Sequence, residues 1–162
     1  MPGDTVIKTI IDPDLGRLDL IEARRTAAGE DGAWEPAIYR GWAGEKGHDR
    51  SFFLSLTATD DPPRIEDAMR ICFRQSLRDI DALRRQLAAM ILPVTQRWAE
   101  AGGGKVALDE EKLGEFLALG AIELSATWLT LYFALPVDIF AGRLLEVRLS
   151  PAGEIARIAL AG

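Results

Sequence analysis

The residues from Ile65 to Trp98 carry the feature that most restricts how this chain can fold. Their apolar side chains recur every three or four residues, which places them on one face of an α-helix. A strand would require alternation at every second residue, and this stretch does not alternate. Pro93 lies inside the pattern and lacks a backbone donor. We therefore predict one long central helix over residues 65–98, kinked at Pro93.

The length of this helix determines what must surround it. From Ile65 to Leu92 it would span about 42 Å at about 1.5 Å per residue, whereas a domain of this size has a radius of gyration of about 15 Å. A helix that crosses the whole molecule needs a broad apolar surface against its stripe, and a β-sheet provides one. Leu83 and Leu87, in the middle of the stripe, should be buried.

Segments with strand patterns stand on both sides of the helix. Before it, residues 6–11 form a short strand or an arm, and 17–22, 37–43 and 52–59 are strands; those after it are 121–126, 128–135, 143–149 and 154–160. Asp109 is a suitable N-cap for a short helix over residues 110–119. The links between strands are short, and helices and strands do not alternate. The chain is therefore expected to form one α+β domain over residues 1–162, with a mainly antiparallel sheet of about seven strands packed on the long helix.

Composition and charge exclude several classes of function. The net charge is −6 at pH 7, which disfavours nucleic acid as a partner. The single cysteine, Cys72, lies on the apolar helix stripe and is expected to be a buried, reduced thiol. No signal-peptide pattern and no apolar run of about 20 residues is present, so we expect a cytoplasmic protein that does not bind membranes. Fifteen Arg against four Lys, with no Asn, indicate a GC-rich bacterial genome.

Catalytic and metal-binding patterns are absent from the sequence. His48 is the only histidine, and it lies in a glycine-rich turn at residues 44–49, where a solvated side chain is the simpler interpretation. No nucleophile elbow and no metal-ligand spacing occurs. The glycine run before Lys105 lacks the Ser or Thr of a phosphate-binding loop. We therefore predict no cofactor and no metal site, and favour a binding protein over an enzyme.

The C-terminal part of the chain resembles an uncharacterised bacterial domain-of-unknown-function family, the 2262 family. The resemblance is carried by Leu131-Tyr132-Phe133, the run Asp138 to Val147, the turn Asp12 to Gly16, the strand around Trp42, and the helix end at Trp98. It covers residues 10–162. The chain departs from the family pattern where an aromatic residue, a histidine and an asparagine are expected, which here are Ala141, Arg143 and Gln96. The resemblance implies no reaction and no catalytic residue.

The first candidate site is a row of three arginines, Arg70, Arg74 and Arg78, spaced four residues apart on the polar side of the helix. Like charges at this spacing repel each other slightly. The structural interpretation is a solvated face in which Glu66 pairs with Arg70 and Asp81 with Arg85. The functional interpretation is an exposed patch that binds an acidic partner.

The second candidate site is the loop at residues 136–142, which places large apolar side chains between two strands. One interpretation is a loop folded onto the core with Phe140 as its anchor. The other is a wall of a binding pocket in which Asp138 and Arg143 face outward, because shaped loops on a rigid sheet often carry recognition residues.

Three hypotheses for function follow from these patterns. The first is a small acidic protein that binds another protein by shape and charge, of the immunity or antitoxin sort. The second is an enzyme that uses carboxylates and Arg143 in a cleft between sheet and helix. The third is a small-ligand-binding module in the same cleft. The oligomeric state is not predicted from the sequence.

Overall fold

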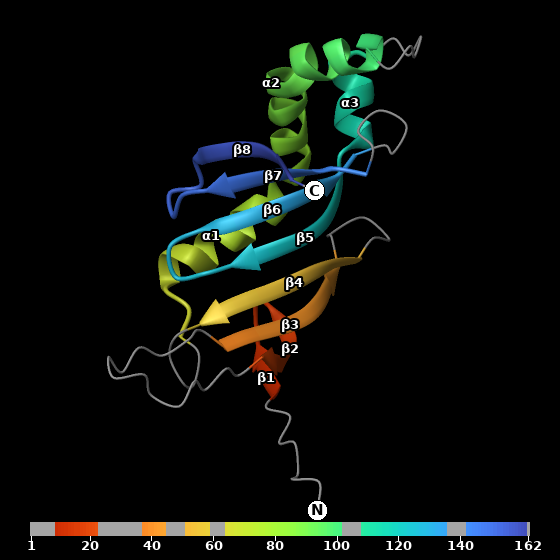
Figure 1. The fold of residues 1–162 in the computed structure, drawn as a ribbon. Helices are drawn as coiled ribbons and strands as arrows, with labels where there is room; N and C mark the ends of the chain where they lie inside the picture. The colour runs from red at the N-terminus through yellow and green to blue at the C-terminus, as the bar shows by residue number, and fades with distance from the viewer. Residues whose placement is uncertain are drawn as a thin grey trace, which may run out of the picture.

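The computed structural model of the chain describes residues 9–22, 37–44, 51–58, 64–101, 108–135 and 142–161. Four strands come first, three helices follow, and four more strands end the chain (Figure 1). The elements are β1 (Thr9–Asp12), β2 (Gly16–Glu22), β3 (Ala37–Gly44), β4 (Ser51–Ala58), α1 (Asp67–Arg78), α2 (Ile80–Ala101), α3 (Glu110–Phe116), β5 (Ala118–Leu124), β6 (Leu129–Ala134), β7 (Leu144–Leu149) and β8 (Ile155–Ala161).

The eight strands form one sheet in which their spatial order is their order in the chain. Every neighbouring pair is antiparallel except β4 and β5, which are parallel. The helices lie between these two strands in the sequence and carry the chain back across the sheet, which a parallel pair requires. The predicted α+β class and mainly antiparallel sheet are confirmed; the described residues contain eight strands, where about seven were expected.

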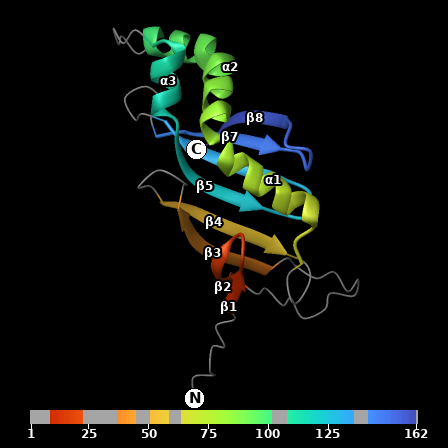
Figure 2. The same ribbon diagram turned by 180° about the vertical axis from the view of Figure 1, so that it is seen from behind.

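The prediction of one long helix is wrong, because the helix breaks at Asp79. This residue has φ −103° and ψ 21°, and its N–H still donates to the carbonyl oxygen of Gln75 at 2.9 Å. The break separates α1 from α2 and lets them run in different directions: α1 lies across the sheet, whereas α2 rises past it (Figure 2). A stripe of apolar residues needs only local helical spacing, so it persists on both sides of a break.

α2 continues through Pro93 to Ala101 and bends in its C-terminal half (Figure 1). A proline removes one backbone hydrogen bond and can bend a helix, and the kink expected at Pro93 itself stays a prediction. The short helix α3 begins as predicted, with the side chain of Asp109 accepting the N–H of Lys112 at 2.8 Å. It ends at Phe116 rather than at residue 119, because Leu117 is extended and the chain enters β5 at Ala118.

The core lies between the helices and one face of the sheet. From the helices it receives Met69, Phe73 and Leu87, each at most 1% exposed, and the predicted burial of Leu87 is confirmed. Leu83 is only partly buried, although full burial was expected. Cys72 is buried as predicted, and burial raises the pKa of its thiol. The alternate residues of the strands complete the core, including Leu54, Leu56, Ile122, Leu124, Leu131, Phe133, Leu145 and Val147.

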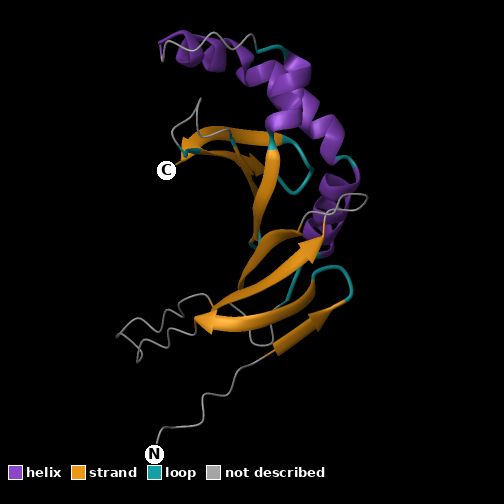
Figure 3. Cartoon of the chain, turned by 90° about the vertical axis from the view of Figure 1, so that its right-hand side faces the viewer, coloured by secondary structure: helices purple, strands orange, loops and turns teal. Residues whose placement is uncertain are grey.

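All three helices lie on the same side of the sheet (Figure 3). The other face, which we call the open face, is covered by no helix within the described part of the chain. In β3, Tyr39 points into the core at 2% exposure, so its neighbours Arg40 and Trp42 stand on the open face. No helix among the described residues is long and apolar enough to cross a membrane.

Candidate functional site

The predicted loop site is described only at its end. Asp138 and Phe140 lie outside the described residues. Arg143 is exposed and stands directly before β7, after Gly142, whose φ of 77° suits a glycine. The binding role predicted for this loop therefore stays a prediction.

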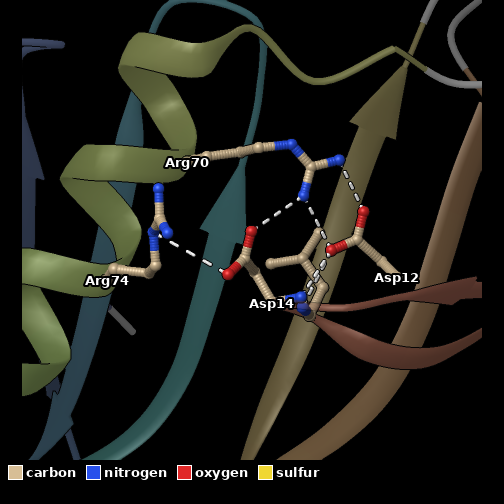
Figure 4. Close-up of polar contacts among 5 residues, drawn as sticks. Asp12, Asp14, Arg70 and Arg74 are labelled. Carbon is tan, nitrogen blue, oxygen red and sulfur yellow. Dashed lines mark hydrogen bonds and ion pairs between the residues drawn. The ribbon is translucent and has the colours of Figure 1, made fainter.

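Arg70 is bound by the protein's own carboxylates rather than presented to a partner (Figure 4). Its guanidinium forms a bidentate ion pair with Asp12. Nη2 lies 2.6 Å from Oδ2, and Nη1 lies 2.8 Å from Oδ1. Nη1 also lies 3.1 Å from Oδ2 of Asp14. The expected partner of Arg70 was Glu66, so the actual pairing corrects that prediction. The contact joins α1 to the turn between β1 and β2.

Asp12 holds this turn in shape. Its Oδ1 accepts the backbone N–H groups of Asp14 at 2.8 Å and Leu15 at 3.1 Å. Gly16 completes the turn with φ 76°, and Leu15 is buried in the core. Hydrogen bonding to Arg70, reinforced by these backbone N–H groups, holds the pKa of Asp12 below its ordinary value despite burial. The cluster of Asp12, Asp14 and Arg70 thus has a structural role.

The other two arginines of the predicted row remain at the surface. The side chain of Arg74 is 58% exposed, with Nε 3.7 Å from Oδ1 of Asp14, and that of Arg78 is 69% exposed beside Asp79. With Arg70 bound internally, the row does not form a patch of three exposed cations. Asp81 pairs with Arg84 at 3.0 Å, whereas Arg85 was the expected partner.

The open face carries a surface that the sequence analysis did not select. Trp42 is 68% exposed, although it is the largest kind of apolar side chain. Its ring packs edge-on against Phe53, with centroids 5.1 Å apart and planes at 82°. The guanidinium of Arg40 lies over the ring of Phe53, 5.3 Å from its centroid. The ring pair is an arrangement that aromatic side chains prefer, and it holds Trp42 in one orientation.

Two residues from β2 complete this surface. Arg17 and Asp19 pair with each other at 3.3 Å, and Asp19 stands opposite Arg40 in the sheet. The side chains border a hollow of about 490 Å³ on the open face. We call this the Trp42 surface, and its members are Arg17, Asp19, Arg40, Trp42 and Phe53.

Gly41 allows the two strands to approach closely enough to build the Trp42 surface. A Cβ atom at this position would collide with the carbonyl oxygen of Arg17 and lie 2.9 Å from Cδ2 of Leu18. A glycine is therefore required at this position for β2 and β3 to lie this close together. The alternation of residues 38–42 was visible in the sequence, but it did not tell which face would stay uncovered.

A second hollow, of about 730 Å³, lies between α2 and α3 rather than between sheet and helix. It is lined by Asp81, Arg84, Arg85, Glu110, Glu111, Gly114, Glu115 and Leu117. Arg84 is 9% exposed, and its Nε donates to the carbonyl oxygen of Leu117 at 2.8 Å. This bond ties α2 to the end of α3. The remaining charged groups of the hollow are predominantly carboxylates.

The C-terminal half of the open face is polar. The hydroxyl of Tyr132 donates to Oε2 of Glu123 at 3.0 Å, and burial together with this carboxylate raises the pKa of Tyr132 to about 12. Arg148 lies 5.6 Å from the ring centroid of Trp128. In the part of the chain that the structure describes, no three His, Cys, Asp or Glu residues come together as a group that could hold a metal ion.

Comparison with models of known protein families gives no match, and neither does comparison with curated proteins or with solved structures. The resemblance to the 2262 family therefore stays a prediction.

Proposed function

We propose that this protein is a binding module for another protein, and that the partner docks on the Trp42 surface. The exposure of Trp42 is the observation that carries the proposal. Trp, Tyr and Arg contribute most of the binding energy in many protein interfaces, usually from the centre of the contact. The Trp42 surface combines one exposed Trp with Arg17 and Arg40 around a shallow hollow.

The packing of Trp42 supports this function as well. Contact with Phe53 restricts the indole before a partner arrives, so that little side-chain freedom is lost on binding. An immunity-like or antitoxin-like protein works in this way, by occupying a partner rather than by transforming a substrate. The two arginines favour a partner with an apolar centre and an acidic rim.

A photo-crosslinking amino acid at position 17, an exposed position at the border of the Trp42 surface that leaves Trp42 itself in place, tests the proposal in cells. It should yield a single adduct with a distinct protein, whereas the same amino acid at position 71 should not. Ile71 is a matched control because it is 46% exposed on α1. The partner identified in this way is then purified and titrated against defined variants.

The titration compares two tryptophans. Trp42→Ala should weaken binding by about 2 kcal/mol or more, because truncation of a central Trp commonly costs this much. Trp128→Ala removes a Trp that is 39% exposed in the turn between β5 and β6, and it should leave the affinity unchanged. Equal affinity of wild type and Trp42→Ala, with both proteins folded by circular dichroism, would contradict the proposal.

The hollow between α2 and α3 favours a second candidate, a small-ligand-binding module. Its volume of about 730 Å³ is within the range of ligand pockets, about 300–1,000 Å³. Glu110, Glu111 and Glu115 suit a cationic ligand such as a polyamine. A panel of amines should then raise the melting temperature of wild type but not of the double variant Glu111→Gln, Glu115→Gln. The enzyme hypothesis relied on carboxylates together with Arg143 in a cleft between sheet and helix. Arg143 is not among the described residues that line this hollow, so the hollow supports ligand binding rather than that hypothesis.

A further inference from the structure

The last strand, β8, forms one edge of the sheet. Within the described chain it pairs only with β7, so its outer backbone groups have no strand beside them. Its residues Ile155–Ala161 include no proline and a single charged side chain, Arg157. Exposed edges are usually protected by prolines, charges or bulges against pairing with another strand. The irregularity in β8 lies near its start, which leaves residues 157–161 in regular register with β7.

The apolar layer of the protein is incomplete at this edge. The core-side residues of β7, Leu145, Val147 and Leu149, are at most 2% exposed. The corresponding residues of β8 are Ile155, Ile158 and Leu160, which are only partly buried against the same core. The core-side residues are therefore less buried in β8 than in the neighbouring strand β7, although they are equally large and apolar.

The helix α2 extends beyond the same edge. Figures 1 and 3 show it rising past β8 on the core side of the sheet. Leu83 and Leu87 of α2 belong to the core, and the same helical row continues at spacings of three and four with Met90 and Val94. These two are 51% and 44% exposed. About half of each side chain is therefore left uncovered within the described structure, although Ile91, beside them on the helix, stays buried.

We propose that this edge is where a second copy of the chain binds, with β8 pairing antiparallel to β8 of the second copy. The pairing would be centred on Ala159 and would join the two sheets into one. Met90 and Val94 of each copy would then cover Ile158 and Leu160 of the other, completing the apolar layer on both sides.

The sequence of β8 suits pairing with itself. With Ala159 on the two-fold axis, Ile158 of each copy stands opposite Leu160 of the other copy. Both are apolar pairs on the core side of the sheet. Arg157 stands opposite Ala161, so the two guanidinium groups are kept apart. Antiparallel pairing of two identical strands within one sheet gives a two-fold axis perpendicular to the sheet. Both sets of helices then lie on the same face, and the interface is isologous.

Sedimentation of the full chain tests the pairing. Wild type should sediment as twice 17.7 kDa at high concentration. Ala159→Lys should raise the dissociation constant by at least about tenfold, because two ammonium groups would meet on the axis. In the single chain the new side chain stands opposite Glu146, so folding is preserved. The matched control is Ala156→Lys, three residues earlier on the same strand, which should leave the dimer intact.

A cysteine at the same position tests the register. Directly opposite residues of an antiparallel pair lie about 4.5–5.5 Å apart at Cα, within the range of about 4.4–6.8 Å that a disulfide spans. Ala159→Cys should form a covalent dimer under mild oxidation, and Ala156→Cys should not. Wild type that stays monomeric up to about 100 μM, a concentration at which weak specific dimers form, would overturn the proposal. So would a dimer that Ala159→Lys leaves unchanged.

Discussion

At the scale of single residues, the contact between Arg70 and Asp12 defines how the first hairpin is attached. The side chain of Asp12 is 8% exposed and accepts four hydrogen bonds, two from Arg70 and two from the backbone of the turn. A paired guanidinium and carboxylate satisfy each other, but either one alone would remain as an unpaired charge in a poorly solvated place. The hairpin and α1 therefore depend on both residues.

Removal of Arg70 is predicted to destabilise the fold without disturbing the Trp42 surface directly. Arg70→Ala should lower the free energy of unfolding by about 1–3 kcal/mol, the cost of leaving hydrogen-bonding groups unsatisfied, with allowance for partial exposure. Arg78→Ala, at the far end of the same row, should cost less than about 0.5 kcal/mol. Urea denaturation measures both. Equal costs would show that the Asp12 contact contributes nothing.

The same contact predicts a dependence of stability on pH. The pKa of Asp12 in the folded protein lies below its ordinary value of 3.8, so the unfolded chain takes up the proton more readily. The stabilisation is complete above that ordinary value and is lost as the pH falls below it through the folded pKa. Wild type should lose more stability between pH 5 and pH 2 (about the range of acid unfolding) than Asp12→Asn. Parallel pH profiles of the two proteins would argue against this.

At the scale of elements, the helical spacing of apolar residues continues across the break between α1 and α2, although the two helices run in different directions. The break at Asp79 leaves Cys72 and Phe73 buried on one side and Ile80 and Leu87 on the other. Because the two helices run in different directions, they cover more of the sheet than one straight helix would. Gly41 acts in a comparable way between β2 and β3, since the strands approach there as closely as their backbones allow.

Along α2 the energetic importance of the apolar row should decrease as the helix leaves the sheet. Leu87 has no exposed surface, so Leu87→Ala should cost about 2–5 kcal/mol of stability. Leu83→Ala should cost less because Leu83 is only partly buried. Denaturation at concentrations where the chain is monomeric makes this comparison. A larger loss from Leu83→Ala than from Leu87→Ala would contradict the burial seen here.

Substitution of Gly41 should distort the contact between β2 and β3. Gly41→Ala places a methyl group against the backbone of Arg17, which cannot move aside as a flexible side chain could. The expected loss is about 1–3 kcal/mol, typical of overpacking. Gly120→Ala is the control, because its Cβ would meet only the carbonyl oxygen of Tyr132 at an ordinary 3.7 Å. Chemical denaturation of both variants should separate them, and equal stability would remove the requirement for glycine at position 41.

At the scale of the whole molecule, the sheet is assembled from two four-stranded halves that meet at the parallel pair of β4 and β5. The helices cover one face and leave the other to the Trp42 surface and the polar residues around Tyr132. The proposed partner would bind on the open face, and the second copy would bind at the edge formed by β8. The two binding events therefore use separate parts of the molecule.

Backbone protection should vary across this sheet. β6 is paired on both sides, and Leu131 and Phe133 have no exposed surface. β1 has four residues at the edge, and Ile11 is 83% exposed. Amide hydrogen exchange followed by mass spectrometry should therefore be slowest in β6 and fastest in β1, because edges open locally before the core does. Uniform exchange across all strands would show that the sheet opens only as a whole.

Features that depend on neighbours along the chain could be predicted from the amino-acid sequence. The α+β class, the strand positions, the Asp109 cap and the burial of Cys72 all follow from spacing or from local hydrogen bonding. Turn chemistry is equally local, as the positive φ of Gly153 between β7 and β8 illustrates. These features were predictable because the residues that cause them are a few positions apart.

Which surfaces remain free depends on contacts between distant parts of the chain. Arg70 is satisfied by Asp12, 58 positions away, and no spacing rule links the two. Alternation in β3 separates Tyr39 from Trp42, but the layer that covers one face comes from helices elsewhere in the chain. The break at Asp79 likewise leaves the apolar spacing unchanged, so the spacing does not predict it. Periodicity records which side chains share a face, whereas exposure depends on what the rest of the chain places against that face.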